Sequence, residues 1–247
     1  MIFEENQRIR MFLELLRCIA TEQFVGINYK IKKKRSGIFM RIETIIVGQM
    51  RTNCYLAWDE TTMRGFLVDP GEQAEKIIQA CDRYQVKPEA VLLTHGHFDH
   101  IMAAKKVKEH YQIPVYAGIH EEEVLSDSEL NLSAIWAEAF TMKADRLVAD
   151  NQEIEIAGME ITVLETPGHT LGGVCYYIKK EKVLFAGDTL FFESFGRTDF
   201  KGGSMFALVR SLRGKLFTLP DEIDVYPGHG QSTTIGHEKT HNPVAGM

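Results

Sequence analysis

One heptapeptide, Thr94-His95-Gly96-His97-Phe98-Asp99-His100, carries four side chains that can bind a metal ion. Its three imidazoles and one carboxylate are donors for divalent cations once they are deprotonated. The apolar run 91–93 before it predicts the end of a buried strand, and residues 101–110 after it predict a helix. A donor-rich turn at a strand end lies at the mouth of a sheet, where α/β proteins tend to bind ligands. The motif therefore predicts a metal site whose other donors lie downstream.

Three further donors follow predicted strands in turns that contain glycine. They lie in Thr166-Pro167-Gly168-His169-Thr170, Ala186-Gly187-Asp188-Thr189 and Tyr226-Pro227-Gly228-His229-Gly230. A single histidine in such a turn is more often a packed or solvent-facing side chain. Because all the donors follow strands, chance is a poor explanation and a shared metal site is the better one. The remaining histidines of the domain have no such context: His110, His120, His237 and His241.

The spacing of the donors divides them between two ions that would lie about 3.5–4 Å apart. We assign His95, His97 and His169 to one ion. Asp99, His100 and His229 go to the other, and Asp188 bridges the two. A water held between two divalent ions ionises near neutral pH and becomes a nucleophile. Asp99 would orient this hydroxide, so the predicted catalytic residues are Asp99 and Asp188. Zinc is the expected metal, although iron and manganese also accept His/Asp ligand sets.

The pattern of apolar residues predicts strands that alternate with helices in two similar halves. Strands are expected at 42–47, 53–58, 65–68, 91–93, 113–116, 152–156, 159–164, 174–178, 182–185 and 223–226. Helices are expected at 74–84, 101–110, around 120–125 and at 204–213. Two such halves predict an α/β fold of the α+β kind, a four-layer αββα sandwich. Residues 130–150 show no clear pattern and are expected to form an irregular lid.

Composition excludes several classes of protein. No apolar run approaches the roughly 18 residues of a transmembrane helix, so no membrane partner is expected. The four cysteines form no C-x-x-C pair, which favours a reducing, cytoplasmic setting. Residues 1–39 contain eight Lys/Arg and four Glu (+4), which leaves −10 for the rest of this −6 chain. A domain of that charge is a poor partner for nucleic acid. Nothing in the sequence indicates the oligomeric state.

The chain is expected to form one domain, residues 40–247, behind a peripheral N-terminal extension at 1–39. The extension has a helical pattern followed by the basic run 30–35, and strand-like alternation begins only at Arg41. An extension outside the domain contributes no part of its core. Deleting residues 1–39 is therefore expected to leave both the activity and the melting temperature nearly unchanged, which a thermal melt and an assay of the truncated protein would check.

The order His95-x-His97-x-Asp99-His100, His169, Asp188 and His229 resembles the metallo-β-lactamase-fold hydrolase superfamily from about Arg41 to Pro243. Other segments resemble the glyoxalase II group, the hydroxyacylglutathione hydrolases, and most closely its short bacterial members. These segments are Thr52-Asn53-Cys54-Tyr55, Asp69-Pro70-Gly71, Gly187-Asp188-Thr189-Leu190-Phe191, Gly196-Arg197-Thr198-Asp199-Phe200 and Tyr226-Pro227-Gly228-His229-Gly230.

The resemblance implies hydrolysis of S-2-hydroxyacyl thioesters, such as S-lactoylglutathione, to a 2-hydroxy acid and a thiol. A thiolate, with a pKa near ~8.5, leaves with little help from a general acid. Phe191 and Arg197 are candidate substrate contacts, but the favoured reading of Arg197 is a structural ion pair with Asp199 that shapes the loop.

Two features leave the substrate open. Typical glyoxalase II carries a C-terminal helical domain that helps to hold glutathione, and this chain ends before one could form, so the thiol carrier is not specified. The alternatives are a mononuclear iron persulfide dioxygenase of the same fold, which has a similar Gly-Arg-Thr-Asp-Phe segment, and a lactonase or other ester hydrolase.

Overall fold

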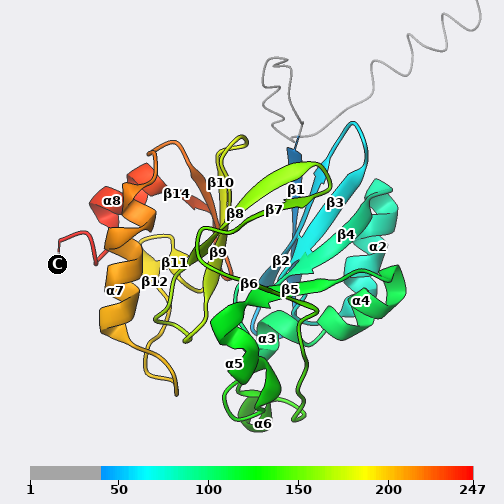
Figure 1. Cartoon of the computed structure of the whole chain (residues 1–247), viewed down its shortest axis with the longest axis horizontal. Helices are drawn as coiled ribbons and strands as arrows, with labels where there is room; N and C mark the ends of the chain where they lie inside the picture. Colours follow the sequence, from blue (N-terminus) through cyan, green and yellow to red (C-terminus); the bar gives the residue numbers. More distant parts are fainter. Residues whose placement is uncertain (1–39, 247) are drawn as a thin grey trace, which may run out of the picture. The chain divides into compact units, whose positions relative to one another are not determined.

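The computed structural model describes residues 40–246. The predicted extension at residues 1–39 lies outside this part, so its boundary with the domain stays a prediction. The described residues form two six-stranded sheets that pack face to face, with helices on both outer sides (Figure 1). The predicted four-layer αββα sandwich is confirmed.

The first sheet has the strand order β1-β2-β3-β4-β5-β6. These strands span Met40–Val47, Thr52–Asp59, Arg64–Val68, Lys87–Leu92, Val115–Gly118 and Arg146–Val148. Strands β1 to β3 pair antiparallel, whereas β3 to β6 run parallel to one another. Because parallel neighbours end at the same edge of a sheet, Asp69 after β3 and Thr94 after β4 come together. The Thr94 amide and hydroxyl both donate to the Asp69 carboxylate, at 2.8 and 2.6 Å.

The second sheet has the order β14-β13-β10-β9-β8-β7. These strands span Thr233–Thr234, Asp224–Pro227, Val183–Gly187, Val174–Ile178, Met159–Glu165 and Glu153–Ile156. The two predicted hairpins, β7–β8 and β9–β10, are confirmed. Strands β10 and β13 run parallel. The residues that follow them, Asp188 and His229, are therefore brought to the same edge.

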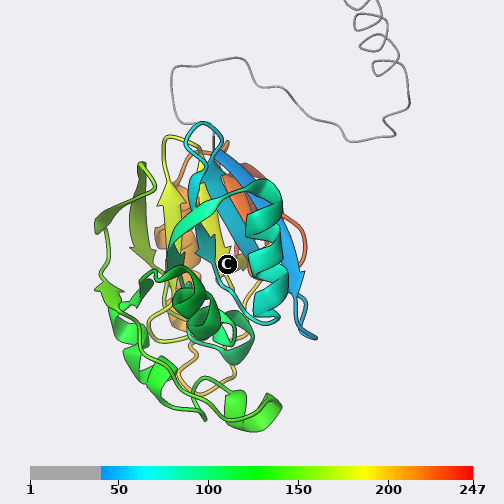
Figure 2. The same cartoon turned by 90° about the vertical axis from the view of Figure 1, so that its right-hand side faces the viewer.

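The helices cover the outer faces of the sheets, and three apolar clusters fill the spaces between the layers (Figures 1 and 2). The α-helices are α2 (Ala74–Tyr84), α3 (Phe98–Ile101), α4 (Ala104–Tyr111), α5 (Glu122–Ser126), α6 (Ser133–Trp136), α7 (Met205–Gly214) and α8 (Ile235–His241). Alternate residues of β2 belong to different clusters: Leu56 packs with α2 and α4, and Tyr55 packs with the other sheet. Strand β2 is thus buried on both faces, which fixes the stacking of the two inner layers.

Some predicted elements differ from those observed. The expected helix at 101–110 is two helices, α3 and α4, because the Ala103 amide donates to Pro70 O and Gly71 O. The predicted irregular lid at 130–150 contains α6 and β6. The sequence patterns predicted neither the short β11–β12 hairpin (Leu190–Phe191 and Ser194–Phe195) nor β14 and α8 after Tyr226. These elements are short, and short elements carry little periodic signal.

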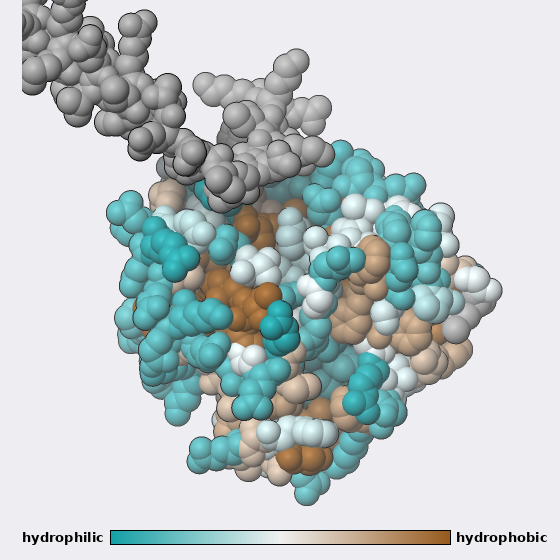
Figure 3. Space-filling view, turned by 180° about the vertical axis from the view of Figure 1, so that it is seen from behind, coloured by the Kyte–Doolittle hydropathy of each residue, from teal (hydrophilic) through white to brown (hydrophobic). Residues whose placement is uncertain are grey.

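The surface is mixed in character. Figure 3 shows hydrophobic residues gathered in the middle of one face with hydrophilic residues around them. Ile135 and Trp136 in α6 and Phe206 in α7 are among the large apolar side chains that remain exposed. Within residues 40–246, no helix has the length and apolar character that crossing a membrane requires.

Candidate metal centre

The seven predicted donors meet at one edge of the sandwich, although they come from both sheets. His95 and His97 lie in the loop between β4 and α3, and Asp99 and His100 open α3. The other three follow strands of the second sheet: His169 after β8, Asp188 after β10 and His229 after β13. Strand ends in both inner layers thus bring to one place donors that are spread over more than a hundred residues of the chain.

Two groups of three donors form within this cluster. His95, His97 and His169 make the first group, hereafter the three-histidine group. The residues Asp99, His100 and His229 make the second, hereafter the aspartate group. In each group the candidate ligand atoms all lie within 4.8 Å of one another. The structure therefore brings together the same two sets that the sequence spacing separates.

Asp188 lies between the two groups. Its Oδ2 is 3.5 Å from His169 Nε2 in the three-histidine group and 3.6 Å from His229 Nε2 in the aspartate group. Its Oδ1 is 3.4 Å from His100 Nε2. A single carboxylate that reaches both groups has the position required of a ligand shared by two ions.

Outer hydrogen bonds fix which ring nitrogen each histidine offers. His169 Nδ1 is 2.7 Å from the carbonyl of Arg197, which can only accept, so Nδ1 carries the proton. His100 Nδ1 is likewise 3.0 Å from the Asp69 carboxylate. In the neutral form of each ring, Nε2 then carries a lone pair directed into the cluster. Partners of this kind orient metal-binding imidazoles and set their tautomers.

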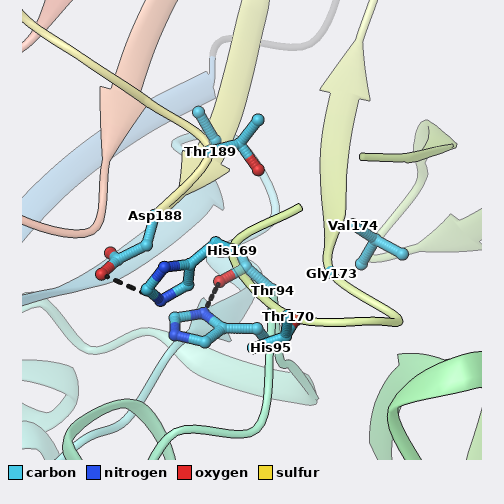
Figure 4. A pocket seen from close by; sticks show the side chains of 9 residues that line it. Thr94, His95, His169, Thr170, Gly173, Val174, Asp188 and Thr189 are labelled. Carbon is cyan, nitrogen blue, oxygen red and sulfur yellow. Dashed lines mark hydrogen bonds and ion pairs between the residues drawn. The ribbon is translucent and has the colours of Figure 1, made fainter. Parts of the chain in front are cut away.

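His95 shows most directly that these residues fit a metal ion. Its Nδ1 lies 3.1 Å from the Thr94 hydroxyl, whose own proton goes to Asp69, so the imidazole donates and keeps a lone pair on Nε2. His95 Nε2 and Asp188 Oδ1 are both buried and have no hydrogen-bond partner. Figure 4 shows His95, His169 and Asp188 lining the same pocket. Buried polar atoms without partners are costly, and a cation between them would satisfy both.

The electrostatics differ between the two groups. Burial lowers the pKa of His95 well below its usual range and that of His97 to about 3, and neighbouring imidazoles add to this effect. Burial also acts to lower the pKa of His100, but the carboxylates of Asp99 and Asp188 outweigh it and raise that pKa well above its usual range. In the aspartate group, protons thus compete for the place of a cation.

The same competition affects His229. Burial acts to lower its pKa, but the hydrogen bond to Asp99 and the negative charges of Asp188 and Asp99 together outweigh burial and raise it. The pKa of Asp188 falls well below its usual range, because the imidazoles of His100, His169 and His229 together outweigh the opposing effect of burial. The carboxylates of the site are therefore ionised, as metal ligands must be.

These pKa shifts predict that the two groups lose metal at different pH. Above about pH 3, His97 is unprotonated and ready to bind, whereas His100 and His229 hold protons up to and beyond their ordinary range near ~6.5. As the pH falls, protons are therefore expected to displace the ion of the aspartate group before the ion of the three-histidine group. Dialysis near pH 5 is expected to remove one of two ions, measured as metal content per chain.

A His229→Ala variant is the control for this assignment, since it disables the aspartate group at every pH. Its remaining ion is expected to survive the same dialysis. Simultaneous loss of both ions from the unaltered protein, or loss of neither, would contradict the pKa assignment.

Three residues that contact the donors or their loops were not predicted as site residues from the sequence. Asp69 binds both Thr94 and His100, and its signal was present, because like the donors it directly follows a strand. The Thr52 hydroxyl donates to Asp99 Oδ2 at 2.9 Å. Glu121 is completely buried and binds the loops of the three-histidine group. Thr52 lies in segment 52–55, one of those that carry the resemblance described above, but nothing in it indicated a contact with Asp99. No local pattern marked Glu121.

The two candidate substrate contacts lie at the edge of the cluster. The Phe191 ring is centred 6.2 Å from that of His229. Arg197 forms the ion pair with Asp199, at 2.9 and 2.8 Å, and stays largely exposed. Its guanidinium carbon lies 4.2 Å from the centre of the Phe200 ring, which contacts His97 edge-on. Phe191 meets the cluster through its ring, and Arg197 meets it through the Phe200 ring and through its own carbonyl, which accepts from His169 Nδ1.

Comparisons with known proteins give a family model and several similar proteins. Residues 47–229 match the family model described as Metallo-beta-lactamase superfamily. A relative from Haemophilus influenzae, called hydroxyacylglutathione hydrolase GloC, is 37% identical over 211 residues, which cover 83% of this chain and 97% of that protein.

Two solved structures are also similar. That of BLEG-1 B3 metallo-beta-lactamase has a TM-score of 0.80 and 40% identity, with 83% of this chain and 99% of that chain covered. That of TTHA1623 in a di-iron-bound form has a TM-score of 0.72 and 34% identity, with 81% and 98% covered.

Proposed function

The chain belongs to the metallo-β-lactamase superfamily, and on this basis we propose that it is a binuclear metal-dependent hydrolase of S-2-hydroxyacyl thioesters. Its substrates would be small molecules such as S-lactoylglutathione, and its products a 2-hydroxy acid and a thiol. The observation that carries the proposal is the pair of three-donor groups with the Asp188 carboxylate between them. We propose zinc as the metal, with iron or manganese as the alternatives.

When bound, two divalent ions would make a shared water acidic enough to act near neutral pH and would polarise the substrate carbonyl. Asp99 would hold and orient that water. The pKa of Asp99 falls below its usual value, because His100 and His229 outweigh the opposing effect of burial. Its Oδ2 is fixed by the Thr52 hydroxyl at 2.9 Å and lies 3.2 Å from His229 Nε2. The carboxylate is thus ionised and oriented, as a group that accepts the water's remaining proton must be.

The surroundings of the donors favour a good leaving group. Among residues 40–246, no lysine, tyrosine or cysteine side chain is hydrogen bonded to any of the seven donors. An amide nitrogen needs a proton donor to leave, whereas a thiolate with a pKa near ~8.5 does not. A thioester therefore suits these residues better than an amide.

Two similar proteins support the proposal. The GloC relative is named as a hydroxyacylglutathione hydrolase, and the TTHA1623 structure holds two metal ions. We further propose a cytoplasmic location, because Cys54, Cys81 and Cys175 are buried free thiols. Neither nucleic acid nor a membrane is part of the proposed activity.

A second candidate function is hydrolysis of a β-lactam. It is favoured by the 40% identity to BLEG-1, a protein named as a B3 metallo-beta-lactamase. The fold alone does not choose between these substrates, because function depends on the residues grafted onto it.

A steady-state comparison of substrates tests the proposal. The metal-loaded protein would be assayed with S-lactoylglutathione, an unrelated acyl thioester, a lactone and a chromogenic cephalosporin. We expect the highest kcat/KM for the 2-hydroxyacyl thioester. A higher kcat/KM for the cephalosporin would favour the second candidate, and a higher value for the lactone would refute the thioester assignment.

A further inference from the structure

Glu121 is a buried carboxylate that the proposed reaction does not use. It ends the short 3₁₀ helix Ile119–Glu121, and its side chain is inaccessible to solvent. Its Oε1 accepts a hydrogen bond from the Gly96 amide at 2.8 Å. Its Oε2 accepts from the Thr170 hydroxyl at 3.0 Å and from the Gly172 amide at 2.8 Å. Both oxygens are therefore engaged, and they bind two different segments of the chain.

These two segments carry the three-histidine group. Gly96 lies between His95 and His97, and Thr170 directly follows His169. The hydrogen bonds of Glu121 therefore tie together the loops that supply all three imidazoles. None of its hydrogen bonds reaches a residue of the aspartate group. Through its hydrogen bonds, Glu121 is thus linked to the three-histidine group and not to the residues of the aspartate group.

Close packing makes this connection rigid. A side chain on Gly172 would clash with the backbone of His120 and Glu121, so the loop after His169 lies directly against the Glu121 segment. On the other side, a side chain on Gly96 would meet Val124 and Leu125 of α5. The Glu121 carboxylate is thus held between two loops, and these loops cannot move apart without breaking the hydrogen bonds to its oxygens.

Only an ionised carboxylate satisfies all the partners of this residue. Two of its three donors are backbone amides, which can donate but never accept. Glutamine would present an NH₂ group to at least one of these donors and would leave a buried group unsatisfied.

The charge of Glu121 has no cationic partner among the ion pairs of the described residues. Burial raises its pKa to about 7, and the three hydrogen bonds oppose this shift without cancelling it. A buried charge without a partner is unfavourable. A cation bound by the adjacent histidines would supply the missing positive charge.

We infer that Glu121 is a positioning residue that sets the metal affinity of the three-histidine group by holding its two loops at a fixed spacing, without touching the ion. The inference rests on the proposed metal centre, and it does not depend on which thioester or other substrate the protein hydrolyses.

Competition between the full-length protein and a chromogenic chelator for Zn²⁺ tests this inference. Glu121→Gln is expected to lower the affinity for one of the two zinc ions ten- to hundredfold, the usual effect of losing an outer partner of a metal site. The other ion should keep its affinity. Unchanged affinity for both ions in this variant would overturn the inference.

Glu238→Gln is the matched control. Glu238 is also completely buried and accepts from Thr233, Asn242 and the Glu193 amide, none of which adjoins a donor. Its substitution leaves a similar unsatisfied group elsewhere in the fold, and both ions should stay bound as in the unaltered protein. Equal weakening of zinc binding by Glu238→Gln would show a general loss of stability and would overturn the inference.

Two double variants identify which ion is affected. In a His229→Ala background, which disables the aspartate group, Glu121→Gln should lower the affinity for the single remaining ion. In a His95→Ala background, which disables the three-histidine group, it should have no further effect. The opposite pattern, or equal effects in both backgrounds, would overturn the inference.

Thr170→Val provides a milder test should Glu121→Gln fail to fold. It removes one of the three hydrogen bonds and is expected to lower the affinity for the same ion by a smaller factor, about tenfold or less. Full zinc affinity in Thr170→Val would then overturn the inference. Fewer than two ions in the unaltered protein would overturn both the metal centre and the inference. Two ions without thioester hydrolysis would refute only the substrate assignment.

Discussion

Replacing Asp188 by alanine is expected to abolish detectable hydrolysis and to release tightly held metal. Asp188 contacts His100, His169 and His229, so its carboxylate reaches donors of both groups. Removing it leaves two separate groups of three donors without a common ligand. We expect kcat/KM to fall by at least about a hundredfold to a thousandfold, the scale for losing one preorganised electrostatic contact. Metal content per chain and a steady-state assay on the same preparation measure both effects.

Asp82→Ala is the control for this variant, since Asp82 is an exposed aspartate on α2. It should leave both the metal content and kcat/KM unchanged. Full activity in Asp188→Ala would refute the bridging role and, with it, the binuclear arrangement.

Replacing Gly228 by alanine is expected to have the second-largest effect. A Cβ at this position would clash with Asp188 Oδ1 and would lie 2.6 Å from His100 Cε1. The methyl group would therefore displace two donor side chains while leaving every donor in the chain. Misplacing reacting groups by about 1 Å can cost about a hundredfold in rate. We expect a loss of that size in kcat, with weaker binding of the ion in the aspartate group.

Gly214→Ala is the matched control for this substitution. Gly214 ends α7, and a Cβ there would meet no atom within 4 Å. The same chemical change should therefore leave the activity intact. Unaltered kcat in Gly228→Ala would mean that the donors adjust freely, which would contradict the close packing around the site.

The convergence of the candidate donors was predictable from the sequence, because they lie in or directly after turns that follow strands. A strand end is a local feature, and His169, Asp188 and His229 all carry it. Asp69 carries it too, but Asp69-Pro70-Gly71 is also a typical turn, and the turn reading hid the contact to His100.

The contacts of Glu121 were not predictable, because they depend on tertiary structure. Its partners Gly96 and Gly172 are 25 and 51 residues away in the chain. Glu121 lies in a run of four glutamates or histidines, which normally indicates a solvated surface. Only the convergence of two loops buries this one acid.

The fold was predictable in its layers but less so in its element ends. Two runs of strands followed by helices predict the sandwich, and the three apolar clusters confirm it. Strand β4 spans Lys87–Leu92, whereas the apolar run 91–93 predicted only its end. The first residues of the strand were missed because a proline such as Pro88 normally argues against a strand interior. A register shift between Gly65 and Leu67 in the neighbouring strand accompanies the proline.

Titration of metal-free protein with Zn²⁺, with hydrolysis of S-lactoylglutathione followed at each step, tests the central claim most directly. The claim is that two ions, one in each donor group, act together on a thioester. Activity is therefore predicted to rise to a plateau at two ions per chain. The contradicting result would be a plateau of activity at one ion per chain, or no hydrolysis of S-lactoylglutathione at any zinc content.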